Sequence, residues 1–503
     1  MEALDEFIVA NPRLELESWK TVVLSKVDTK IDRLQANITP RHTNTVLQQP
    51  AVKQYLEKLQ KHFVVVPIDK ASNNIAIICK RFYAEVLLKE VGKLDGISET
   101  YVSSDKSVNE ILHNDFLHND RYGLKVGAVN STLPSMYWMP KMHKTPIGFR
   151  FIVASSTCST KPLSKTVSSI FKLIYNQTEN FHSSAKFLSN YNKFWVLKDA
   201  SPITDIIKKV NSRGKADTVS TFDFSTLYTK LPHGDLVHKL SEIVDLVFEG
   251  GKHKYIRISK NGNANWAKCS SNFTCFSKNA VKQATQYLIE NCHFTVGNCI
   301  LRQCIGIPMG IDPAPFWANL FLHVYENDYV TNLIQTDRVR ARKLNLIKRF
   351  LDDLCAINDD GEFGRIYRDI YPPELELKLE HSGNHATFLN LSITVMGDKF
   401  VHKLFDKRDD FPFSIVRMPY KSSNMPESIF YSAFSGEFLR ISRSSMLADD
   451  VISSSHELVV RMVNQGAKMD RINRVLRKVI EKHTSVFAGF GLGSHELIQR
   501  INT

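Results

Sequence analysis

Two adjacent carboxylates stand between two short apolar runs in the stretch 345–358, whose sequence is NLIKRFLDDLCAIN. The apolar runs 346–351 and 354–357 flank Asp352 and Asp353, and this pattern predicts a β-hairpin with the two acids at its tip. Adjacent carboxylates repel each other unless cations lie between them, so the tip is a candidate divalent-metal site. A solvated turn is the alternative, because the chain has three other such pairs: Asp359-Asp360, Asp409-Asp410 and Asp449-Asp450.

A third carboxylate lies near the end of a predicted buried strand. Residues 219–224 are apolar and β-prone apart from Asp223, and residues 234–248 follow with one apolar helical face. A carboxylate at a strand-to-helix junction can hold a metal ion, although it caps a helix equally often. Because a strand end and a hairpin tip can meet across one sheet, Asp223 is the candidate partner of Asp352 and Asp353.

Two segments carry cations that could face a phosphate. Predicted strands at 136–140 and 149–154 bracket a basic loop, and Lys141, Lys144 and Arg150 would clamp phosphates there. A solvated basic hairpin is the alternative. Upstream, strands at 63–67 and 75–79 enclose a polar loop that begins with Asp69 and Lys70. A turn with a local ion pair explains that loop equally well.

The loop from Gly306 to Gly310 has the sequence GIPMG and precedes a predicted helix over 313–328. Glycines let a backbone approach a flat ligand such as a base pair. Such a loop alone is a weak signal, but followed by this helix and the acidic hairpin it is strong.

Composition indicates the class of partner. The 503 residues predict two to four domains or subdomains, and Lys plus Arg exceed Asp plus Glu by 65 to 52, a net charge of +13. This balance fits a polyanion such as nucleic acid, although a basic surface that serves solubility is the alternative. No CxxC, signal peptide or membrane-length apolar run is present, which predicts an intracellular chain with reduced thiols and no membrane partner.

The last part of the chain is predicted to be helical over 426–446 and 457–482, after a strand at 387–395 and a further hairpin. The exposed faces of these helices carry basic residues that could grip a duplex backbone. A merely solvated basic face is the alternative. The candidates for nucleic-acid contact are Arg440, Arg443, Arg474, Arg477 and Lys478.

The order of these motifs resembles that of reverse transcriptases. FDFSTLYTKLP resembles the A motif, QCIGIPMGIDPAPFWANLFL the B motif and RFLDDL the C motif, while PKMHK with RFIVAS resembles the finger motifs. Within that superfamily the chain is most similar to Penelope-like retroelement reverse transcriptases, relatives of telomerase. The segments that carry this similarity are VVVPIDKA, MPKMHK, STLYTKLPH, GIPMG and SGEFLRISR, while TFLNLSI resembles the region that follows the acidic hairpin in reverse transcriptases generally.

The resemblance implies an α+β right-hand polymerase with an antiparallel palm sheet backed by helices and an all-α thumb. Its parts would be a helical N-terminal extension over 1–60, fingers over 61–200, a palm over 201–415 with an insertion at 251–275, and a thumb over 416–503. The implied activity is RNA-directed DNA synthesis, with an RNA template, a DNA primer or target DNA, and dNTPs as partners. Nuclear localisation is implied by the resemblance alone.

The resemblance also implies roles for single residues. Asp223 and Asp352 would bridge two Mg²⁺ or Mn²⁺ ions, with Asp353 assisting, and Lys141 and Arg150 would neutralise the triphosphate. Either Lys378 or Lys403 would protonate pyrophosphate, and the sequence does not decide between them. The remaining expected nucleotide contacts are the backbone at Phe224 and Ser225, the sugar-selecting Tyr228, and Gln303, Gly306, Pro308 and Gly310 under the templating base pair.

Two departures from the family qualify this prediction. Most members carry a GIY-YIG endonuclease after the thumb, and neither tripeptide occurs here, which leaves a separate endonuclease open as a partner. Ala71 also stands where the family has glycine, so the role of Asp69 and Lys70 is undecided. The alternative function is a domesticated, catalytically inactive nucleic-acid-binding homologue, and the three retained acids argue against it.

Overall fold

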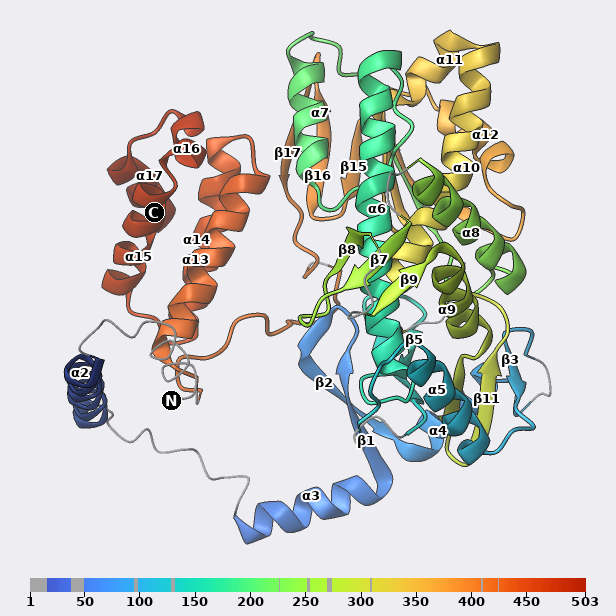
Figure 1. Cartoon of the computed structure of the whole chain (residues 1–503). Helices are drawn as coiled ribbons and strands as arrows, with labels where there is room; N and C mark the ends of the chain where they lie inside the picture. The colour runs from blue at the N-terminus through green and yellow to red at the C-terminus, as the bar shows by residue number, and fades with distance from the viewer. Residues whose placement is uncertain are drawn as a thin grey trace.

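The computed structural model describes residues 16–37, 49–94, 98–127, 132–225, 227–250, 254–268, 274–307, 310–408, 410–423 and 425–503 (Figure 1). Pro308, one of the predicted nucleotide contacts, lies outside these ranges. Within them, no helix combines the length and the apolar character that a membrane span requires.

An antiparallel sheet of four strands lies at the centre of the molecule, in the order β12-β13-β6-β14. The predicted hairpin and the predicted buried strand are both present as neighbours in this sheet. Asp353 pairs directly with Asp223 across the β13–β6 ladder. The four strands are β12 (Ile347–Phe350), β13 (Asp353–Ile357), β6 (Val219–Phe224) and β14 (Leu377–Gly383).

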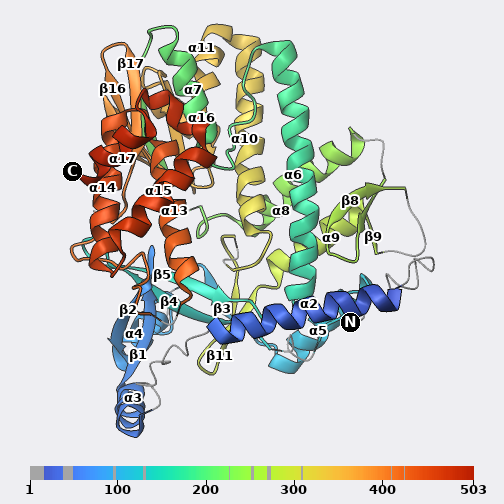
Figure 2. The ribbon, with the colours of Figure 1, turned by 90° about the vertical axis from the view of Figure 1, so that its left-hand side faces the viewer.

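Helices cover one face of this sheet and form the largest core. Phe222 and Leu354 point into it because alternate residues of a strand face the same side. Long helices α6 and α10 run side by side through the molecule (Figures 1 and 2). The covering helices are α6 (Lys161–Ser189), α8 (His233–Glu249), α9 (Lys278–Glu290), α10 (Ala314–Thr336) and α12 (Glu362–Ile370).

The opposite face packs against helix α7 (Ser201–Asn211) and a second antiparallel sheet. This sheet consists of β15 (His385–Phe388), β16 (Leu391–Met396) and β17 (Lys399–Leu404). The single strand predicted over 387–395 is therefore wrong. Leu389 adopts a φ of 56° and turns the chain, but the apolar pattern continues through it, so periodicity did not reveal the break.

A second group of strands comes from two parts of the chain, 63–154 and 255–303. Sheet β3-β11-β10-β4-β5 holds the predicted basic flap as its edge hairpin β4–β5, and β1 and β2 form a separate ribbon. The insertion forms the small sheet β8-β7-β9. The strands of these sheets are β1 (Phe63–Ile68), β2 (Ala71–Cys79), β3 (Tyr101–Ser103), β4 (Ser135–Lys141), β5 (Gly148–Ala154), β7 (Tyr255–Ile258), β8 (Ala264–Ala267), β9 (Cys275–Ser277), β10 (His293–Val296) and β11 (Cys299–Gln303).

The described residues from 427 onward are helical, and their helices gather into a bundle with its own core (Figure 1). The helix predicted over 457–482 is interrupted, because Gly466 adopts a φ of 95° between two helices. The bundle helices are α13 (Glu427–Ser444), α14 (Ala448–Asn464), α15 (Met469–Lys482), α16 (Thr484–Phe487) and α17 (Ser494–Asn502). The remaining helices are α2 (Leu16–Asn37), α3 (Pro50–His62), α4 (Lys80–Glu90), α5 (Val108–Arg121) and α11 (Arg338–Lys343).

Candidate active site

Three aspartates converge at one end of the central sheet. Asp223 ends β6, Asp353 begins β13, and Asp352 lies in the turn before it. One carboxylate oxygen of each aspartate lies within 4.8 Å of a carboxylate oxygen of the other two. Among the described residues, no other set of three or more Asp, Glu, His or Cys side chains comes together in this way. The Phe224 N–H donates to the Asp352 carbonyl at 3.1 Å, which fixes the turn against the strand end.

The electrostatics of this cluster favour a bound cation. Burial, followed by the charges of Asp352 and Asp223, raises the pKa of Asp353 to about 7. Burial also raises the pKa of Asp352, and the charge of Asp223 adds to the effect. Carboxylate oxygens are the ligands that Mg²⁺ and Mn²⁺ prefer, so these three side chains fit a divalent ion.

The three aspartates line a cavity of about 850 Å³ together with several cationic side chains. Lys141, Lys144 and Arg150 of the β4–β5 hairpin line this cavity, as predicted for the basic flap, and Lys70 joins them. Burial, and then the charge of Arg150, lowers the pKa of Lys141, which eases proton loss from that ammonium group. A cavity lined by both clustered acids and cations suits a triphosphate bound through metal ions.

Phe224 and Ser225 also line this cavity. Their backbone N–H groups already donate, however, to the carbonyls of Asp352 and Glu376, at 3.1 Å each. In this structure these two residues therefore shape the cavity, and their amide groups are not available as donors to a ligand.

The glycine loop packs against the strands that carry the site. Gly306 has a φ of 90° and Gly310 a φ of 100°, both in the region that favours glycine. A side chain at Gly306 would collide with the carbonyl of Tyr228, and one at Gly310 with the carbonyl of Val153. The need for glycine here thus arises from close contact with the protein's own backbone.

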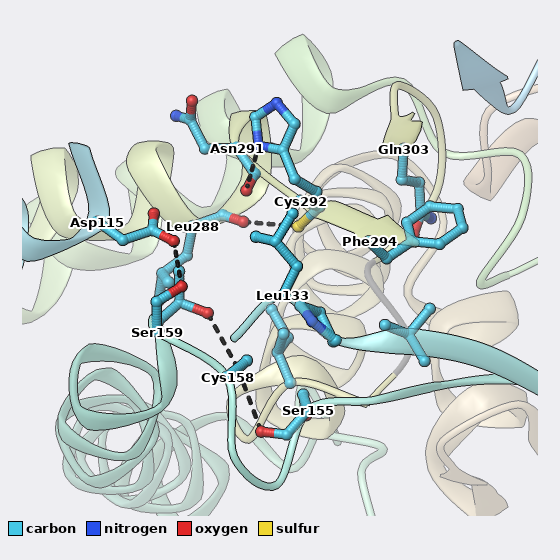
Figure 3. A pocket seen from close by; sticks show the side chains of 15 residues that line it. Asp115, Leu133, Ser155, Cys158, Ser159, Leu288, Asn291, Cys292, Phe294 and Gln303 are labelled. Carbon is cyan, nitrogen blue, oxygen red and sulfur yellow. Dashed lines mark hydrogen bonds between the residues drawn. The ribbon is translucent and has the colours of Figure 1, made fainter. Parts of the chain in front are cut away.

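Tyr228 and Gln303 do not line the cavity that holds the aspartates. Tyr228 is close enough to Asp352 that this charge, after burial, raises its pKa to about 12. Gln303 is 4% exposed and borders a separate, small cavity of about 30 Å³ with Asp115 and Cys158 (Figure 3). Its amide donates to the Ile305 carbonyl at 2.9 Å, which stabilises the start of the glycine loop.

A buried ion pair that the sequence prediction missed supports the hairpin. Arg349 on β12 and Glu326 on α10 are both fully buried, and the guanidinium reaches the Glu326 carboxylate at 3.2 Å. Arg349 also donates to the Leu351 carbonyl at 3.0 Å, where Leu351 holds a φ of 54° directly before Asp352. Asn319 and Tyr371 complete the network. The sequence did contain a signal for this pair, because Arg349 occupies an inward-facing position in an otherwise apolar strand and therefore needs a buried partner.

The structure also places the lysines considered as proton donors. Lys403 lies 3.8 Å from Asp450, and Lys378 is paired in register with Asp223, but neither lines the cavity of the aspartates. Lys407 does line it, and its charge acts on Asp353. Lys407 is therefore a further candidate that sequence reasoning did not name.

The predicted contacts of the C-terminal bundle lie on α13 and α15. Arg443, Arg474, Arg477 and Lys478 are exposed. Arg440 instead forms an ion pair with Glu437 at 2.6 Å, so its charge is locally compensated.

No protein-family model and no curated protein sequence matches this chain. Solved structures do match. Telomerase from Candida albicans, in complex with the TWJ fragment of telomeric RNA, is similar with a TM-score of 0.61 and 11% identity over 89% of this chain and 71% of that chain. Telomerase from Candida tropicalis with the same fragment has a TM-score of 0.49 and 13% identity, over 90% and 69%.

The RNA-dependent RNA polymerase of bacteriophage phi12 has a TM-score of 0.33 and 12% identity, over 71% and 47%. Only the first of these three structures has a TM-score above 0.5. At such low identities the similarity concerns the fold alone. The chain has the mixed α/β fold of a right-hand polymerase, with antiparallel sheets, as the sequence motifs predicted.

Proposed function

We propose that this protein is an RNA-directed DNA polymerase of a Penelope-like retroelement, which extends a DNA primer on an RNA template with dNTPs. The observation that carries the proposal is the convergence of Asp223, Asp352 and Asp353 in one cavity that cationic side chains also line. The fold shared with telomerase and the sequence motifs support it. The RNA in the telomerase complex supports an RNA template here by analogy.

The division into fingers, palm and thumb is proposed from the order of the sequence motifs. Strands β10 and β11, which fall in the proposed palm range, join the sheet that holds the flap. The fingers over 61–200 would contain the basic flap, the palm over 201–415 the central sheet, and the thumb over 416–503 the helical bundle. In this arrangement the exposed cations Arg443, Arg474, Arg477 and Lys478 would contact the phosphate backbone of the template–primer.

Each side chain of the cavity has a chemical task in this proposal. Asp223, Asp352 and Asp353 would hold two divalent ions, which when bound lower the pKa of a primer hydroxyl and stabilise charge on the leaving pyrophosphate. Lys141 and Arg150 would bind and orient the triphosphate as its charge changes. Tyr228, which does not line this cavity in the structure, is assigned from the sequence resemblance alone to exclude a ribose 2′-hydroxyl by its bulk.

Primer extension tests the activity. An annealed RNA template and DNA primer is incubated with dNTPs and Mg²⁺ or Mn²⁺, beside the double variant Asp352→Ala/Asp353→Ala. We expect extension by the wild-type protein alone. Template–primer binding without extension by either protein would favour the inactive nucleic-acid-binding homologue.

Sugar selectivity tests the type of polymerase. We expect the wild-type protein to prefer dNTPs over rNTPs, and Tyr228→Ala to relax this preference, while Tyr228→Phe retains it. A clear rNTP preference of the wild-type protein would contradict reverse transcription. Unchanged discrimination in Tyr228→Ala would remove the proposed role of this side chain.

A further inference from the structure

The turn between β1 and β2 is attached to the basic flap. Asp69 is 5% exposed, and its carboxylate forms an ion pair with the Arg150 guanidinium at 2.8 Å. Its backbone N–H donates to the Pro140 carbonyl at 3.1 Å. Lys70 follows with a φ of 61°, and its side chain lines the cavity of the aspartates. The ion pair of Asp69 is thus a long-range contact to the flap and no local pair with Lys70.

The same turn also forms hydrogen bonds with the segment 411–418, which leads to the C-terminal bundle. The β1–β2 ladder passes from Ile68 opposite Ala71 to Pro67 opposite Ile75, so residues 72–74 bulge out of it. In this bulge the Asn74 side chain donates to the Val416 carbonyl at 3.2 Å and accepts from the Val416 N–H at 2.9 Å. One amide therefore satisfies both backbone groups of a single residue, as a neighbouring strand would.

Apolar contacts reinforce this junction. Ile68 and Ala71 of the ribbon form a small buried cluster with Phe411, and Met142 of the flap and Ile415 pack against it. The flap, the turn and the segment 411–416 thus meet at one place, although they lie far apart in the sequence.

The same segment is hydrogen-bonded to the C-terminal bundle. The Met418 carbonyl accepts from the Gln465 side chain at 3.2 Å, and the Lys421 N–H donates to the Gln465 carbonyl at 3.0 Å. Gln465 directly follows helix α14. Only one residue therefore separates Val416, which Asn74 binds, from Met418, which Gln465 binds.

We propose that residues 69–74 form a brace that couples the phosphate-binding flap to the C-terminal bundle. Asp69 is a positioning residue that holds Arg150 toward the triphosphate. Asn74 is a positioning residue that holds the bundle where its basic helices retain the template–primer. The proposal rests on the proposed polymerase function and assigns its two residues to two separable properties, nucleotide affinity and template–primer retention.

The first test measures retention by the full chain without nucleotides. A fluorescent RNA template–DNA primer is bound, an excess of unlabelled duplex is added, and the dissociation rate is followed by polarisation. We expect Asn74→Leu, which loses the two hydrogen bonds to Val416 and the one to the Ala71 carbonyl, to dissociate roughly 10-fold faster. Asn74→Asp, which keeps the acceptor for the Val416 N–H, should lie between it and the wild type. Asn261→Leu, in the exposed turn of the β7–β8 hairpin, is the matched control and should match the wild type.

The second test separates the two ends of the brace. Asp69→Asn should raise the KM for dNTP several-fold with little change in the dissociation rate, and Asn74→Leu should do the reverse. A general loss of structure would instead move both properties together and lower the melting temperature, and that outcome would overturn the proposal. Equal dissociation rates of Asn74→Leu and the wild type would overturn it as well.

A third measurement is independent of nucleic acid and of activity. Amide hydrogen exchange over residues 411–418 should become faster in Asn74→Leu, because the Val416 N–H loses its acceptor. Unchanged exchange would show that the brace does not hold this segment. If the wild-type protein extends no primer but exchange and dissociation respond as expected, the polymerase assignment fails and the brace stands. If the wild-type protein retains no template–primer, the role of the brace in retention is wrong.

Discussion

Two charged clusters meet at the hairpin of the central sheet and differ in how their charge is compensated. Arg349 and Glu326 are completely buried, and each satisfies the charge of the other. Asp352 and Asp353, a few residues away, lie beside a third carboxylate, and their pKa values are raised. The first cluster is complete within the protein, whereas the second requires protons or cations from solution. This difference separates a structural charge cluster from a candidate catalytic one.

The largest effect is expected from the uncompensated cluster. Asp352→Asn should lower kcat/KM for nucleotide incorporation by about 10³-fold, because several kcal/mol of transition-state stabilisation depend on the bound ions. The melting temperature should stay the same or rise, since one repelling charge is removed. The exposed Asp360, which pairs with Lys343, provides the control Asp360→Asn. An equal loss of template–primer binding in Asp352→Asn would make this acid structural.

Substitution in the Arg349–Glu326 cluster should lower stability, in contrast to substitution of Asp352. Arg349→Met should lower the stability of the region around β12 by about 3–5 kcal/mol, because it leaves the Glu326 carboxylate buried without its partner. The double variant Arg349→Met/Glu326→Met should recover much of this loss, since apolar side chains can replace a buried pair. Amide hydrogen exchange in β12 and α10 measures both effects. A double variant that is no more stable than the single one would contradict this account.

The dependence of stability on pH sharpens the comparison further. The folded Asp353 keeps its proton up to about pH 7, whereas the ordinary value of the group is 3.8. Without divalent ions, stability should therefore fall as pH rises from about 4 to 7, because the folded state binds more protons than the unfolded state in that window. Mg²⁺ or Mn²⁺ should raise the melting temperature more at pH 8 than at pH 5.

The variant Asp353→Asn is the control for this experiment. It should lose much of the pH slope and should also reduce the shift caused by the metal. Melting curves at the two pH values, with and without the ion, decide the question. A metal-induced shift of equal size at both pH values would speak against competition between protons and cations at these carboxylates.

The smallest effect concerns the exposed cations of the bundle. If Arg474 and Arg477 each neutralise one phosphate, the double variant to Gln should reduce the slope of log affinity against log salt by about 1–2. Binding of template–primer at several salt concentrations measures the slope. Arg368→Gln, on the exposed side of α12, should leave it unchanged. Identical slopes for the wild type and the double variant would place the nucleic acid elsewhere.

Much of the fold and the acidic site was predictable because the signals are local. The hairpin tip at Asp352 follows from two apolar runs around a polar pair, and the strand that carries Asp223 follows from its β-branched and aromatic residues. The breaks at Leu389 and Gly466 were missed, because the apolar pattern continues on both sides of each turn. Hydrophobic periodicity shows which face of a helix or strand is buried. It does not reveal a turn after which the same spacing of apolar residues continues.

The sequence by itself determined which groups carry charge and which segments present them. Only the tertiary structure decided which charges are compensated. Arg349 meets Glu326, Asp69 meets Arg150 rather than its neighbour Lys70, and Lys407 rather than Lys378 or Lys403 lines the aspartate cavity. These partners come from different elements, and the energy of a charge depends on burial and on the distance to its partner, both of which packing sets.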